Sequence, residues 1–201
     1  MSHQPAESVE VLRDEDFSPE VVASEKVYAG RVWDVRSDTV SYGDSEMVRQ
    51  YVEHPGASAV VALDEDGRVV LIQQYRHPIR SRDWEIPAGL LDVEGEPPVE
   101  AAKRELAEEV DLQAARWEPL LSVHTSPGGN DEVVHIFLAR DLSEASEIFE
   151  REDEEADMRV ERVALTEVVT AIVEGRLRNS ILIMGVLATA ELLRREAATD
   201  D

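Results

Sequence analysis

The sequence predicts a mixed α/β fold in which helices cover the faces of a mixed sheet. Runs of β-branched residues precede, flank and follow one central helical pattern at residues 97–110. Two more helical patterns close the chain, at residues 166–174 and 180–195. Because an apolar sheet face must be buried against another layer, this order favours helices packed on a mixed sheet. The 201 residues, 43% of them apolar, are enough for one such domain with an extension.

The N-terminal part, residues 1–55, predicts an acidic arm and a small antiparallel strand unit, set apart from a second domain over residues 56–201. A short strand is expected at residues 9–13. Apolar and polar residues alternate over residues 26–52, and Gly43-Asp44 in the middle is typical of a turn. We therefore expect a two-stranded antiparallel unit before the second domain.

The second domain begins with two β-branched runs, at residues 59–63 and 68–76, on either side of an Asp-Gly turn. This pattern predicts a β-hairpin. The helix that follows is amphipathic, with an apolar stripe at Val99, Ala102, Leu106 and Val110. The remaining strands are expected at residues 84–87, 117–125, 133–139 and 159–165, with an acidic loop at 143–157.

The charge balance excludes several classes of protein. With 20 Lys and Arg against 44 Asp and Glu, the net charge of −24 repels phosphate backbones and anionic membranes. We therefore expect neither a nucleic-acid partner nor a membrane partner. No apolar stretch reaches the roughly 20 residues of a membrane span, and the N-terminus lacks the pattern of a signal peptide. The absence of cysteine excludes disulfides and thiolate metal sites and fits a cytoplasmic protein.

The polar side of the helix at 97–110 carries an unusual cluster of carboxylates. Glu105, Glu108 and Glu109 fall within an arc of about 100°. They repel one another by a few tenths of a kcal/mol per pair, and they lie near the helix end that disfavours anions. Such oxygen donors suit Mg²⁺ or Mn²⁺. A solvated acidic face is the alternative, but Glu96 at the helix entrance and Arg104 beside the carboxylates favour a metal site.

The stretch from Gly89 to Leu112 resembles the Nudix box, GX5EX7REUXEEXGU, in which U is a bulky aliphatic residue. The part EX7REUXEE matches at every fixed position. Six residues instead of five separate Gly89 from Glu96, and Asp111 stands where the box has its last glycine. That glycine serves a helix end with positive φ, which Asp tolerates better than most residues.

The resemblance extends beyond the box. The segments VVLIQQYRHP, WEIPAGLLD, TSPGGNDE and EEADM resemble the ADP-ribose pyrophosphatase branch of the Nudix hydrolases, notably the actinobacterial type. This implies a Nudix-type α/β/α sandwich with a mixed central sheet, as the catalytic domain over residues 56–201. It also implies metal-dependent hydrolysis of ADP-ribose to AMP and ribose 5-phosphate, with two to three Mg²⁺ or Mn²⁺ ions per site.

The resemblance also assigns residue roles. Glu105, Glu109 and Glu108 would be metal ligands, together with the backbone carbonyl of Ala88, and Arg104 and Glu96 would orient them. In the acidic loop Glu155, or else Glu154, would be the catalytic base, with Glu108 close to the chemistry. Substrate contacts are expected from Arg76, Arg49, Pro127, Gly128 and Gly129.

From the residues alone, each of these assignments has a structural alternative. Arg76 could be a surface residue at a strand end, Glu154 and Glu155 solvated loop charges, and Pro127–Gly129 a simple turn. Two other functions also stay open: hydrolysis of another nucleoside diphosphate sugar or a dinucleotide, and a non-catalytic ADP-ribose sensor. The sensor is disfavoured because the box keeps its carboxylates and the chain lacks a basic helix-turn-helix.

The strand unit at residues 26–52 also predicts an assembly. Two strands alone are at best marginally stable in water, so the unit must pack on something. In the family that the chain resembles, N-terminal strands pack across a twofold axis and help to build the partner's site. We therefore expect a homodimer with composite active sites.

Overall fold

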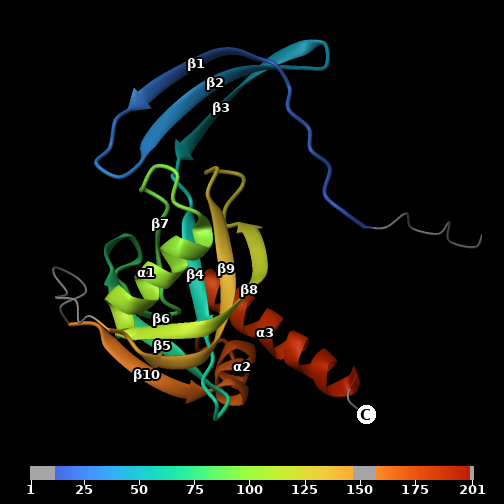
Figure 1. The fold of residues 1–201 in the computed structure, drawn as a ribbon. Helices are drawn as coiled ribbons and strands as arrows, with labels where there is room; N and C mark the ends of the chain where they lie inside the picture. The colour runs from blue at the N-terminus through green and yellow to red at the C-terminus, as the bar shows by residue number, and fades with distance from the viewer. Residues whose placement is uncertain (1–11, 147–156, 200–201) are drawn as a thin grey trace, which may run out of the picture.

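The computed structural model describes residues 12–146 and 157–199, and residues 1–11, 147–156 and 200–201 lie outside the described part. A three-stranded sheet stands above an α/β body that contains all the helices (Figure 1). Most of the short strand expected at residues 9–13 lies outside the described residues, and Leu12 and Arg13 are in no strand.

The N-terminal sheet is antiparallel with the order β1-β2-β3. Its strands are β1 (Val21–Tyr28), β2 (Asp34–Tyr42) and β3 (Ser45–Glu53). The expected pair around Gly43-Asp44 is confirmed as β2 and β3, which pair from Tyr42↔Ser45 to Asp34↔Glu53. The prediction of only two strands was wrong, because β1 adds a third along β2.

The body holds the remaining strands in two further sheets. One sheet is antiparallel with the order β10-β5-β6, and the other is mixed with the order β7-β4-β9-β8. The strands are β4 (Ala57–Ala62), β5 (Arg68–Arg76), β6 (Ser81–Glu85), β7 (Ala88–Leu90), β8 (Leu112–His124), β9 (Val133–Glu144) and β10 (Arg159–Ala164). The helices are α1 (Pro98–Val110), α2 (Leu165–Val173) and α3 (Ser180–Thr199), with a 3₁₀ turn at His77–Ile79.

The hairpin expected between residues 59–63 and 68–76 is wrong. The two runs form β4 and β5, but these belong to different sheets, and their only strand pairing in the described residues is an isolated bridge between Leu63, just after β4, and Val69. All six residues of β4 are buried, and its partners are β9 in parallel and β7 in antiparallel orientation. Continuous apolar runs of this kind need cover on both faces, which a two-stranded hairpin does not provide.

Helices on opposite faces bury the two sides of β4, as expected for an α/β/α sandwich. Ala59 and Val61 belong to a core cluster with Val168 of α2 and with Leu182 and Val186 of α3. The alternate residues Val60 and Ala62 belong to a second cluster with Ala102, Leu106 and Val110 of α1. Because strand side chains alternate between faces, one strand separates the two halves of the core. The mixed α/β fold class is therefore confirmed.

No helix in the described part of the chain is long and apolar enough to cross a membrane.

The turn between β4 and β5 is organised by Asp64 rather than by hairpin pairing. This buried carboxylate accepts hydrogen bonds from the backbone N–H groups of Asp66 (3.0 Å) and Arg68 (2.8 Å) and from Arg68 Nε (3.0 Å). Burial by itself raises the pKa of Asp64. The hydrogen bonds and charge from Arg68 outweigh burial and leave this pKa below its usual value.

We predict that Asp64→Asn lowers the free energy of unfolding at neutral pH by about 1–3 kcal/mol, because buried donors lose a charged acceptor. A lowered folded-state pKa stabilises the fold above the unfolded pKa of about 4 and stops doing so as pH falls through the folded value. The difference between wild type and variant should therefore shrink below about pH 4. Urea unfolding at neutral and acidic pH measures it. Asp66→Asn is the control. Because Asp66 is exposed, this substitution should lower the free energy of unfolding by less than about 1 kcal/mol.

Candidate active site

Helix α1 forms the base of the site, close to where the sequence predicts it. It buries Ala102 and Leu106 and turns Glu105 and Glu108 toward the opposite side. The helix ends at Asp111, whose φ of 55° is left-handed and whose N–H reaches the carbonyls of Leu106 and Ala107. Asp111 therefore takes the positive-φ position expected for the missing glycine of the box.

Arg104 neutralises the crowded acidic face of α1. Its guanidinium donates to Glu96 (Nη2, 3.1 Å; Nε, 3.4 Å), to Glu105 (Nη1, 2.5 Å) and to Glu108 (Nη1, 3.2 Å). The hydrogen bond to Glu96 is the main cause that raises the pKa of Arg104, against the effect of burial. A permanently charged planar fork is suited to hold several carboxylates in fixed orientations. These direct contacts support the orienting role predicted for Arg104 and Glu96.

The carboxylates of Glu105 and Glu109 meet the backbone at Ala88 and Gly89. Glu109 is 3% exposed and accepts a hydrogen bond from the N–H of Ala88 at 2.9 Å. A Cβ on Gly89 would lie 2.0 Å from the Glu105 carboxyl group, so only glycine fits there without displacing that group. A cavity of about 260 Å³ lies here, lined by Gln74, Arg76, Ala88, Gly89, Leu90, Asp92, Arg104, Glu105 and Glu109.

The chemistry of these donors fits a hard divalent cation. Carboxylate oxygens and a backbone segment line the cavity, and no His or Cys side chain is among the lining residues. Within residues 12–146 and 157–199, however, no three acidic, His or Cys side chains are already arranged around one point. The described residues therefore supply Glu105 and Glu109, while the expected loop acids Glu154 and Glu155 lie outside the described part.

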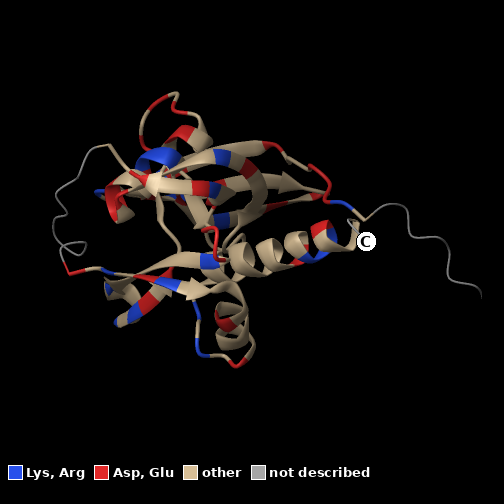
Figure 2. Cartoon of the chain, turned by 60° about the horizontal axis from the view of Figure 1, so that its bottom comes forward, with Lys and Arg blue, Asp and Glu red and all other residues tan. Residues whose placement is uncertain are grey.

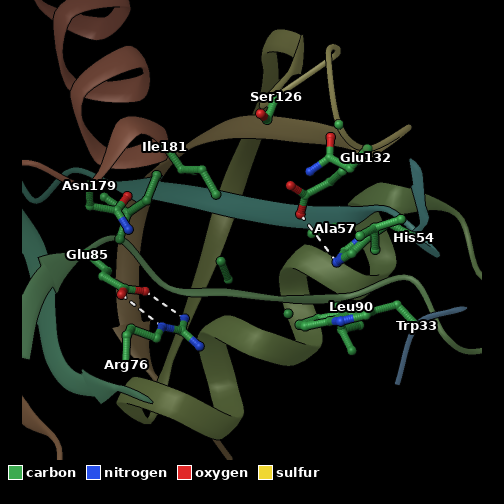
Figure 3. A pocket seen from close by; sticks show the side chains of 16 residues that line it. Trp33, His54, Ala57, Arg76, Glu85, Leu90, Ser126, Glu132, Asn179 and Ile181 are labelled. Carbon is green, nitrogen blue, oxygen red and sulfur yellow. Dashed lines mark hydrogen bonds and ion pairs between the residues drawn. The ribbon is translucent and has the colours of Figure 1, made fainter. Parts of the chain in front are cut away.

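A larger cavity of about 590 Å³ adjoins the acidic one and shares Arg76, Ala88, Gly89 and Leu90 with it (Figure 3). Arg76 ends β5 and makes a two-pronged ion pair with Glu85, from Nε at 2.9 Å and from Nη2 at 2.7 Å. Glu85 is buried, and this ion pair satisfies both of its carboxylate oxygens away from water. The pair orients the Arg76 guanidinium at the junction of the two cavities, where the sequence predicts a phosphate contact.

The far wall of the larger cavity contains residues for which the sequence analysis proposed no role in the site. Trp33 is stacked on His54, with ring centroids 5.2 Å apart, and His54 Nε2 lies 3.5 Å from Glu132 (Figure 3). Asn179 and Ile181 complete the wall from the start of α3. These residues come from four separated parts of the chain. The only sequence signal was the TSPGGNDE segment that contains Glu132.

The predicted substrate contacts divide into two groups. Gly129 lines the cavity together with Ser126 and Asn130, whereas Pro127 and Gly128 are not among the lining residues. Arg49 lies on β3, is exposed and donates to the carbonyl of Val48, away from the cavity of its own chain. Within one chain, therefore, Gly129 of this turn lines the cavity and Arg49 does not.

Comparison with known proteins identifies the family. The model of the NUDIX domain family matches residues 52–180. The chain belongs to the Nudix family. The chain has the Nudix fold and is a Nudix hydrolase.

Named relatives cover most of the chain. It is 43% identical over 178 residues to the ADP-ribose pyrophosphatase of Mycobacterium tuberculosis, covering 88% of this chain and 84% of that protein. It is 34% identical over 171 residues to the methanol dehydrogenase activator of Bacillus methanolicus, covering 85% and 91%. A solved structure titled as an ADP compounds hydrolase shares the fold, with a TM-score of 0.75, 22% identity and coverage of 92% and 98%.

We predict that Gly89→Ala folds but loses divalent-metal affinity by about tenfold or more. The added methyl meets the end of the flexible Glu105 side chain, so the carboxylate moves rather than the backbone. Calorimetric titration with Mn²⁺, together with thermal unfolding, separates these effects. Gly128→Ala is the matched control, because a Cβ there meets nothing within 4 Å. Unchanged Mn²⁺ binding by Gly89→Ala would contradict this account of the cavity.

Proposed function

We propose that this Nudix hydrolase cleaves the diphosphate bond of ADP-ribose, giving AMP and ribose 5-phosphate. The observation that carries the proposal is the pair of joined cavities, one acidic and one of about 590 Å³, with Arg76 at their junction. The larger cavity is in the volume range of small-molecule sites. The relatives from Mycobacterium tuberculosis and Bacillus subtilis bear the name ADP-ribose pyrophosphatase, the latter 38% identical over 135 residues.

The proposed metal site consists of Glu105, Glu109 and the backbone carbonyl of Ala88, with Glu108 close behind. Two to three Mg²⁺ or Mn²⁺ ions, when bound, would neutralise the diphosphate and lower the pKa of an attacking water. Arg104 and Glu96 hold the carboxylates in place. A strongly acidic chain can accept an anionic substrate only if its site charge is compensated in this way.

The remaining roles belong to a base and to substrate contacts. Water adds to one phosphorus atom, the bridging P–O bond breaks, and the water's proton passes to a carboxylate. We assign this base to Glu155, with Glu154 as the alternative. Arg76, oriented by Glu85, would contact the diphosphate, and Gly129 would line the substrate cavity. We further place the enzyme in the cytoplasm, in keeping with its lack of cysteine.

A panel of diphosphate compounds with Mg²⁺ or Mn²⁺ tests the proposal. We predict that ADP-ribose is among the best substrates, ahead of other nucleoside diphosphate sugars and dinucleotides. Glu109→Gln should lower kcat by at least about a hundredfold, while the metal-free fold stays as stable as wild type because a repulsive charge is removed. Phosphatase-coupled release of phosphate from the products measures the rates.

Two outcomes would contradict parts of this proposal. If ADP-ribose is hydrolysed poorly while a nucleoside diphosphate sugar is hydrolysed well, the substrate assignment fails and the Nudix chemistry stands. If Glu109→Gln keeps the wild-type rate at saturating metal, its role as a metal ligand is wrong. A chain that binds ADP-ribose without hydrolysing it would be a sensor.

We also propose that two copies associate through the N-terminal sheet. Apolar side chains on this sheet are exposed in the single chain, among them Val21, Val22, Val27, Tyr28, Tyr42 and Val48. An exposed apolar surface of this kind is typical of an interaction site. A second copy is the occupant that fits, because Trp33 and Val52 of the same unit line the substrate cavity and a twofold axis could add the partner's residues there.

We predict that deletion of residues 1–52 yields a monomer or an aggregate with little ADP-ribose hydrolysis, although every box residue is retained. Deletion of residues 1–11 is the control, since it leaves β1, β2 and β3 in place. Sedimentation velocity reports the oligomeric state, and the coupled assay reports the activity. A soluble, monomeric and fully active chain lacking residues 1–52 would refute the composite dimer.

A further inference from the structure

A second polar cavity, of about 470 Å³, lies at the opposite end of the body from the candidate active site. The strand β5 connects the two, with Arg68 at its start beside this cavity and Arg76 at its end beside the active site. Eight residue steps separate them, or roughly 26 Å along the strand. The lining residues are Leu63, Asp64, Glu65, Arg68, Arg116, Arg140, Asp141, Leu142 and Arg162, none of which lines either active-site cavity.

Four arginines from four different strands converge on this cavity. Arg68 belongs to β5, Arg116 to β8, Arg140 to β9 and Arg162 to β10. They are four of the 20 basic residues in a chain that carries 44 acidic ones. Basic and acidic positions are mixed over the elements of the body (Figure 2). The lining also contains Asp64, Glu65 and Asp141, so four arginines against three carboxylates leave the cavity with a formal charge of +1 in a chain of net charge −24.

The acidic groups near the cavity bind only some of the N–H donors of these four arginines. Asp64 holds Arg68 through Nε and lies 3.6 Å from Nη1 of Arg162. Among the described residues Arg116 has one ion pair, to Glu118 at 3.4 Å. Since each guanidinium carries five N–H donors, single contacts of this length leave most donors of Arg116 and Arg162 available to a ligand.

Arg140 is the least exposed of the four arginines. Its side chain is 15% exposed, and both terminal nitrogens bind Glu196 on α3, at 3.1 and 3.3 Å. Its Nε is buried, has no hydrogen-bond partner among the described residues and lies 3.8 Å from a carboxylate oxygen of Glu118. Arg140 therefore acts on the cavity through its positive charge, while the more exposed Arg116 and Arg162 present the donors that a ligand can reach.

We propose that this cavity binds a small phosphate-bearing anion, such as inorganic phosphate or a phosphomonoester. Arginine forks match the geometry of phosphate oxygens and form short charge-assisted hydrogen bonds with them. The site needs no divalent metal, because arginine side chains supply its positive charge. It is a binding site separate from the diphosphate chemistry, and it stands whether or not ADP-ribose is the substrate.

Calorimetric titration of the metal-free full-length chain with inorganic phosphate and with ribose 5-phosphate tests this site. We expect a Kd at or below about 1 mM for at least one of them. The double variant Arg116→Gln/Arg162→Gln should weaken binding by about tenfold or more, since these arginines are 50% and 44% exposed and support little of the fold. Raising the chloride concentration should weaken binding as well.

Two control variants locate the binding. Arg176→Gln removes an exposed arginine that pairs only with Glu174 among the described residues, and it should leave phosphate affinity unchanged. Arg76→Gln removes the arginine of the candidate active site and should also leave it unchanged. Thermal unfolding checks that each variant folds, and bound phosphate should raise the melting temperature of wild type but not of the double variant. If the double variant unfolds, Arg116→Gln alone serves the same purpose.

Two results would overturn the proposal. One is a wild-type chain that binds neither probe in the millimolar range. The other is binding that Arg76→Gln abolishes and Arg116→Gln/Arg162→Gln leaves intact, because the phosphate would then occupy the active site.

Discussion

The ion pairs between Arg104 and three carboxylates are the interaction on which the candidate active site depends. Without a cation among them, Glu96, Glu105 and Glu108 would repel one another, and Glu105 and Glu108 lie in the C-terminal half of α1, where the helix dipole disfavours anions. The guanidinium contacts all three at 2.5 to 3.2 Å at its closest approach to each, so the acids are held in place before any metal binds. Preorganisation of this kind lowers the cost of assembling a metal site.

The divergence of β4 and β5 into separate sheets gives the body its two polar ends. At one end the backbone of β7 comes close enough to α1 for Glu109 to bind the N–H of Ala88. At the other end Asp64 pairs with Arg68 and Arg162 of the antiparallel sheet, and Arg116 and Arg140 of the mixed sheet line the same cavity. A simple hairpin would have placed β4 and β5 side by side in one sheet. The sandwich instead separates an acidic cavity from a basic one along the length of β5.

Local signals in the sequence predicted local structure well. The apolar stripe of α1 marks its buried face, and the pattern around Asp111 correctly predicts a helix end with positive φ. Nonlocal pairing was harder to predict. The Asp-Gly turn after β4 is typical of a hairpin, but the choice of β9 as a parallel partner depends on residues some 75 positions away. The strand β1 was missed because its eight residues are all exposed and show no buried face.

The candidate site shows the same difference between local motifs and long-range contacts. The Nudix box and Arg76 follow from contiguous motifs, whereas the stack of Trp33 on His54 joins residues 21 positions apart that share no motif. Glu85 has no predicted role because its importance lies in the two-pronged contact with Arg76. Strand register alone does not indicate this contact, since it places Arg76 opposite Ser81 and Glu85 opposite Ile72. Residues that act through a long-range partner leave little trace in a single sequence.

The wall that Trp33 and Val52 add to the larger cavity has a further consequence. These residues belong to the N-terminal sheet and its end, while the carboxylates belong to α1 in the middle of the chain. The wall of the larger cavity and the carboxylates of α1 are therefore encoded in separate stretches of sequence. Substitutions in the N-terminal sheet can reshape this wall while leaving every residue of α1 unchanged.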